Sequence, residues 1–229
     1  MNGMLFAASG TAALLLIGEW LWRKKITKGE IARKFVHITA ATFAAFWPLF
    51  MNRNDIVILS LLFVAALVVI KKLHIFNSLH SVQRATYGEI WYAISIGVIA
   101  LVFKDDVIYA IAILHLALAD GFAAVIGAGL AKRARNFRFR GCRKSIAGTL
   151  TFLIISFALN LSYWAFATHY PINNSGIYLS PILYSLLSAA LLAGTEISAP
   201  KGSDNVIVPL LAGGLLWIPT VLLAANVIF

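Results

Sequence analysis

The sequence predicts an all-α integral membrane protein, a single domain over residues 1–229 that crosses the bilayer about eight times. Of its 229 residues, 61% are hydrophobic and only 12% are charged, and the mean hydropathy is +0.87. A soluble domain would carry about 25% charged residues. Several apolar runs approach the roughly 20 residues that a helix needs to cross the hydrocarbon core.

Eight helices are expected where charges, prolines and glycines interrupt the apolar runs. Pro48 should end the second helical region, because proline cannot continue the helical hydrogen-bond ladder without a kink. The expected helices cover residues 4–22, 31–50, 55–70, 88–103, 107–131, 146–168, 178–195 and 205–228.

The positive charges fall on alternate connections between these helices. Four connections hold 17 of the 19 lysines and arginines, and the others hold only Arg53 and Lys104. Because positively charged loops favour the cytoplasmic side, we expect this side to face the cytoplasm and the N-terminus to lie outside. The four basic connections are residues 23–34, 71–87, 132–144 and 196–204.

The net charge of +10 would favour nucleic-acid binding in a soluble protein. Here the basic residues lie in short loops beside apolar helices. Anionic membrane lipids or a nucleotide triphosphate explain them better, and we expect no nucleic-acid partner. The single cysteine, Cys142, excludes an internal disulfide.

One acid, Asp120, lies inside an apolar helical run. A charged side chain there costs roughly 2.5–3.5 kcal/mol on insertion scales, so it should hold a cation, pair with a partner or face a wet cavity. Two more acids, Glu196 and Asp204, flank the last basic connection. These oxygen ligands suit Mg²⁺, which is usually held by one or two carboxylates plus substrate phosphates.

Basic residues at two helix starts could meet an anion. Arg33, Lys34 and His37 share one helical face with Glu30. Interfacial snorkelling would also explain the arginine and the lysine, and the histidine could instead donate to a neighbouring carbonyl.

The second helix start lies in the segment RGCRKSIAGTL, residues 140–150. Backbone N–H groups and the helix dipole attract phosphate at such an end, and Ser145 can cap the helix. A plain basic loop that orients the chain is enough to explain the preceding basic residues Lys132, Arg133, Arg135 and Arg138.

These residue types leave two classes of protein open. One is an enzyme that handles phosphates at the inner membrane face, and the other is a small transporter with an intramembrane acid. The sequence has no GxxxxGK[ST] phosphate loop and no nucleophile elbow. The outer halves of the helices carry almost no ionisable groups, which disfavours a transport path.

Five short motifs follow one another between about residues 30 and 210. They are EIARKFVH at 30–37, TYGEIWY at 86–92, LADGFAAVIGAG at 118–129, RKSIAGT at 143–149 and SDNVIVP at 203–209. Together they resemble the CTP-dependent lipid-alcohol kinase family, which includes dolichol kinase, phytol kinase and CTP-dependent diacylglycerol kinase. This family is related to phosphatidate cytidylyltransferase.

The resemblance implies transfer of the γ-phosphate of CTP to a lipid hydroxyl with a divalent metal. A further glycine is usual in the family where Ala131 stands. The family patterns fall on Asp120, Ala123 and Gly127; on Lys144, Ser145, Gly148 and Thr149; on Arg33, Lys34 and His37; and on Asp204 and Asn205, after Glu196.

We therefore expect a kinase that phosphorylates a membrane-embedded isoprenoid alcohol of the polyprenol, dolichol or phytol type. Asp120, with Asp204 or Glu196, would bind Mg²⁺, and His37 or an acid would orient or deprotonate the hydroxyl. Phosphatidate cytidylyltransferase and diacylglycerol kinase remain as alternatives. The nucleotide would contact Lys144, Arg33, Lys34, Ala123, Gly127, Ser145, Gly148, Thr149 and Asn205.

Overall fold

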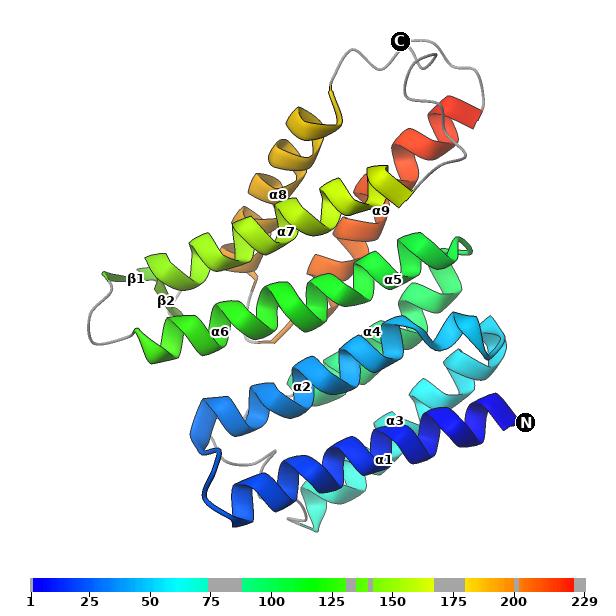
Figure 1. Cartoon of the computed structure of the whole chain (residues 1–229), viewed down its shortest axis with the longest axis vertical. Helices are drawn as coiled ribbons and strands as arrows, with labels where there is room; N and C mark the ends of the chain where they lie inside the picture. Colours follow the sequence, from blue (N-terminus) through cyan, green and yellow to red (C-terminus); the bar gives the residue numbers. More distant parts are fainter. Residues whose placement is uncertain are drawn as a thin grey trace.

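The computed structural model describes residues 2–73, 88–130, 135–139, 142–166, 180–199 and 202–224, and every structural statement below refers to these ranges. Helices occupy all eight of the predicted regions (Figure 1). Ala131 and the predicted helix ends at 167–168, 178–179 and 225–228 lie outside the described residues.

The first half of the chain forms four long helices. Pro48 lies in a short 3-10 helix just after the second of them, because proline lacks the N–H that would continue the α-helical hydrogen-bond ladder. The elements are α1 (Asn2–Arg23), α2 (Gly29–Ala45), η1 (Trp47–Leu49), α3 (Arg53–Lys72) and α4 (Gly88–Val102).

The second half begins with one continuous helical rod, in which a π-helical turn joins two α-helices. Two short strands and three long helices follow. The elements are α5 (Asp106–Leu114), η2 (His115–Ala119), α6 (Asp120–Gly129), β1 (Asn136–Phe139), β2 (Cys142–Ser145), α7 (Ile146–Phe166), α8 (Pro181–Ser198) and α9 (Asp204–Ala224).

The strands correct the all-α prediction in one place. β1 and β2 pair antiparallel, with Phe137 opposite Lys144 and Arg138 opposite Arg143. Phe137 and Phe139 alternate with Arg138, which is the period-two pattern of a strand, whereas the basic charge of the stretch predicts only a loop. Figure 1 shows the hairpin beside the end of α6 and the start of α7.

Five helical segments are long and apolar enough to cross a membrane: α1, α3, the α5–α6 rod, α7 and α8. Helices α4 and α9 are apolar but offer shorter spans. Large apolar side chains such as Leu61, Ile154 and Ile182 are exposed, as a lipid-facing surface requires. The chain is therefore a multi-pass membrane protein, while the number of eight spans and the outside N-terminus remain predictions.

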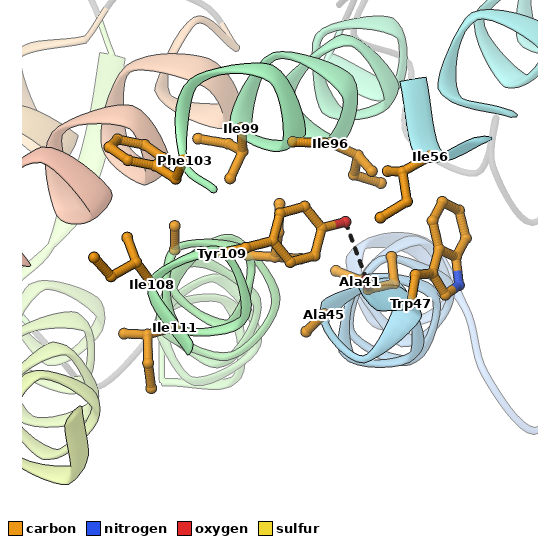
Figure 2. Close-up of a cluster of buried hydrophobic side chains, with 14 of the residues drawn as sticks. Ala41, Ala45, Trp47, Ile56, Ile96, Ile99, Phe103, Ile108, Tyr109 and Ile111 are labelled. Carbon is orange, nitrogen blue, oxygen red and sulfur yellow. Dashed lines mark hydrogen bonds between the residues drawn. The ribbon is translucent and has the colours of Figure 1, made fainter. Parts of the chain in front are cut away.

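A hydrophobic core joins α2, α3, α4 and α5 (Figure 2). Trp47 and Tyr109 are its largest fully buried side chains, and they lie among Ile56, Ile96 and Ile99. The Tyr109 hydroxyl donates to the carbonyl of Ala44 at 3.1 Å. This core fixes α2 against the α5–α6 rod and so positions the polar residues at the other end of α2.

Candidate functional site

Three carboxylates from three different helices converge. Asp120 begins α6, Glu196 lies near the end of α8, and Asp204 begins α9. One oxygen of each lies within 4.8 Å of the others. This arrangement brings together all three acids that the sequence predicted as metal ligands.

The donor set fits Mg²⁺. Carboxylate oxygens are the ligands that this ion takes, and bonds of about 2.1 Å place opposite oxygens about 4.2 Å apart. A small contraction of the cluster would therefore accommodate one ion. In the structure, lysines pair with two of the three acids and offset the repulsion among them.

Asp120 accepts a hydrogen bond from Lys34 of α2, whose side chain is only 5% exposed. His37, one turn further along α2, places its Nε2 3.3 Å from the same carboxylate oxygen. The residues Lys34 and His37 thus lie side by side at the acid, as their spacing predicted. The pairing also accounts for a charged group inside an apolar run, since a buried carboxylate needs such a cation.

The π-helical turn η2 helps to hold His37. Such turns interrupt the regular hydrogen-bond ladder and often occur at functional sites. The carbonyl of Leu116, within this turn, lies 3.1 Å from His37 Nε2. Because Nε2 faces both this carbonyl and Asp120, it carries the proton in a neutral ring, and Nδ1 is then the acceptor.

Lys144 connects the hairpin to the carboxylate cluster. Its Nζ donates to the side chain of Glu196 and, at 3.2 Å, to the backbone carbonyl of the same residue. Burial disfavours the ammonium form, but the negative charges of Glu196, Asp204 and Asp120 outweigh burial and raise the pKa of Lys144. The lysine therefore stays charged at neutral pH.

The start of α7 packs closely against α6. Ser145 caps the helix as predicted, accepting from the backbone N–H of Gly148 at 3.0 Å. A Cβ on Gly148 would lie 2.8 Å from the carbonyl oxygen of Ala123, and one on Gly127 would lie 2.8 Å from Ser145 Oγ. Both glycines are thus required for the contact. Thr149 follows at a half-buried position.

Besides Lys34 and Lys144, two further residues predicted to contact the nucleotide also have protein partners in the structure. Arg33 pairs with Glu30 and lies 3.9 Å from Glu89. The side-chain amide of Asn205 donates to the carbonyl of Gly88 at 2.8 Å and is buried. These two side chains thus connect α2 and the start of α9 to the start of α4.

Residues at the start of α4 also contribute to this region, although no sequence motif predicts a role for them individually. The ring of Tyr92 packs against the ring of His37 at a tilt of 52°, with the centroids 4.6 Å apart, and Glu89 faces Arg33. Gly202 has a φ of +90° and packs against Gly88. The motif TYGEIWY pointed to this stretch, but only the packing of α4 beside α2 and α9 shows what its residues contact.

Comparison with known proteins gives one informative relative. The chain is 31% identical over 224 residues to a phytol kinase of Synechocystis sp., covering 93% of this chain and 91% of that protein. No family model matches the chain, and no solved structure matches it. The similarity extends over nearly the whole length of both proteins. The chain therefore belongs to the lipid-alcohol kinase family.

Proposed function

We propose that this protein transfers the γ-phosphoryl group of CTP to the hydroxyl of a prenyl-type alcohol, at the cytoplasmic face of a membrane. The observation that carries the proposal is the convergence of Asp120, Glu196 and Asp204, flanked by the buried Lys34 and the partly buried Lys144. Phosphoryl transfer depends mainly on positioning and charge neutralisation, and this cluster offers both. The name of the phytol kinase relative supports a prenyl alcohol as the acceptor.

The three carboxylates would hold Mg²⁺ with the triphosphate, and the ion would neutralise charge on the phosphate oxygens. Lys34 and Lys144 each donate to one of these carboxylates. With the carboxylates bound to the metal, these two lysines would be free to bind the phosphates. The backbone N–H groups at the start of α7 add further donors.

His37 is the best-placed base for the lipid hydroxyl. Its Nε2 is held by Asp120 and the Leu116 carbonyl, so Nδ1 can accept the proton. The alcohol oxygen then bonds to the γ-phosphorus while the bond from that phosphorus to the β-phosphate oxygen breaks. CDP leaves, and the lipid phosphate remains in the membrane.

Labelled CTP tests the proposal. Purified protein is incubated with Mg²⁺, phytol and CTP labelled at either the α- or the γ-phosphate, with ATP as the alternative donor. The γ-label should enter the lipid product and the α-label should not. Incorporation of the α-label when phosphatidate is supplied in place of phytol would instead identify a cytidylyltransferase, and absence of any lipid product from a panel of alcohols would overturn the proposed activity.

A further inference from the structure

An apolar pocket lies between α1, α2, α3 and α4. Its polar end is formed by Arg33, His37 and Glu89, at the starts of α2 and α4. Its far end reaches Trp47, beyond the opposite end of α2. At 1.5 Å per helical residue, His37 and Trp47 are roughly 15 Å apart along α2, a length suited to a hydrocarbon chain.

The pocket and the carboxylate cluster meet at one side chain. His37 lines the pocket, and its Nε2 lies 3.3 Å from Asp120 on the other side. A molecule with an apolar chain in the pocket would place its head group beside this imidazole. A hydroxyl suits this position, because it can form a hydrogen bond with the imidazole and carries no charge that would need a buried partner.

The pocket is also open to the surrounding lipid. Ala66 of α3 lines it and is at the same time exposed on the surface of the bundle. In a membrane this surface faces hydrocarbon, so a chain can enter sideways without passing through water.

We propose that this pocket binds the hydrocarbon chain of the acceptor, and that it accepts one chain. The proposal rests on the proposed kinase function. The opposite side of His37 is occupied by Lys34, Asp120 and the Leu116 carbonyl, where a second apolar chain would desolvate charges. Single-chain prenyl alcohols are therefore substrates, and diacylglycerol is not.

The neighbouring alanines of α3 provide a matched test. Ala65 and Ala66 are both exposed, but only Ala66 lines the pocket. Ala66→Phe should raise the KM for phytol by about tenfold or more with little change in kcat, because it removes ground-state binding of the chain. The KM values for CTP and for a five-carbon prenyl alcohol should not change.

Ala65→Phe, the control, should behave as the wild type. Equal KM values for phytol in the two variants would overturn the assignment of the pocket to the hydrocarbon chain. Efficient phosphorylation of diacylglycerol would overturn the proposal that the pocket accepts only one chain.

Cross-linking reports on the pocket independently of turnover. A prenyl alcohol with a diazirine near the end of its chain should label peptides of α1–α4, and unlabelled phytol should compete. Labelling confined to α7–α9 would contradict the proposal. If the wild type phosphorylated no alcohol but α1–α4 were labelled, the kinase assignment would fail while the lipid-binding pocket remained.

Discussion

Asp120 is a residue with two separable roles. It neutralises the buried Lys34 in the structure, and it belongs to the carboxylate cluster that we propose binds metal. Removing one partner of a buried ion pair typically costs 3–5 kcal/mol of stability, so loss of activity in a single variant could reflect either role.

A double variant separates the roles of Asp120. Asp120→Asn should abolish lipid phosphorylation and lower the melting temperature in detergent, because Lys34 is left unpaired. Adding Lys34→Met should restore much of the melting temperature, as both charges are then gone, without restoring activity. Activity in Asp120→Asn comparable to the wild type would remove this acid from the mechanism.

His37 should act on the chemical step. His37→Gln keeps a polar side chain but removes the base, and we expect kcat to fall by about 10²–10⁴, the usual contribution of general base catalysis. The KM for CTP should change little. The acidic limb of the pH–rate profile should also disappear. A variant that retained this limb would assign the base to another group.

We expect Lys144 to contribute to binding of the nucleotide. Lys144→Ala should raise the KM for CTP or lower the rate, because one of the two lysines at the cluster is lost. Arg138→Ala is the matched control, since it removes one positive charge from an exposed position on the same hairpin. If the two variants had the same CTP kinetics, Lys144 would contribute only general charge.

At the scale of elements, the site depends on how closely α6 and α7 approach. Small residues allow this contact, as they do between many membrane helices. Gly148 faces the Ala123 carbonyl, whereas Gly129, at the end of α6, has no atom within 4 Å of the Cβ it would carry. The two glycines therefore differ in packing although both lie in helices.

Gly148→Ala should lower stability by about 1–3 kcal/mol through overpacking and should reduce activity by displacing Ser145 and Lys144. Gly129→Ala should leave activity unchanged, because its methyl group meets open space. Thermal unfolding in detergent and CTP turnover measure both effects. Equal stability of the two variants would show that the close approach of α6 and α7 does not require a glycine at position 148.

At the scale of the whole molecule, the carboxylate cluster lies at the starts of α6 and α9 and near the end of α8, beside the hairpin. In the predicted eight-helix topology, the basic connections 23–34 and 196–204 lie on the same side of the membrane. The positive-inside rule therefore predicts that the proposed active site faces the cytoplasm.

Cysteine labelling tests this orientation. In a Cys142→Ser background, the new cysteine of Lys25→Cys should react with a membrane-impermeant maleimide only in inside-out vesicles. Asn52 is an exposed residue between η1 and α3, and the new cysteine of Asn52→Cys should react only from the outside of the cell. The reverse pattern would place the carboxylate cluster outside the cytoplasm.

Much of this protein follows from its sequence alone. The eight helical regions, the capping serine and the three acids were all predictable, because apolar runs, caps and charges are local features. The hairpin was not predicted, although Phe137, Arg138 and Phe139 alternate, because the basic charge of the segment suggested a loop.

Only the tertiary structure decided which residues meet. Lys34 and Asp120 are 86 positions apart, and no local pattern indicates that α2 lies beside α6. Neither does any motif show that Arg33 and Asn205 contact α4, or that one imidazole lies between the acids and an apolar pocket. These pairings arise from side-chain packing between distant helices, which short sequence patterns do not specify.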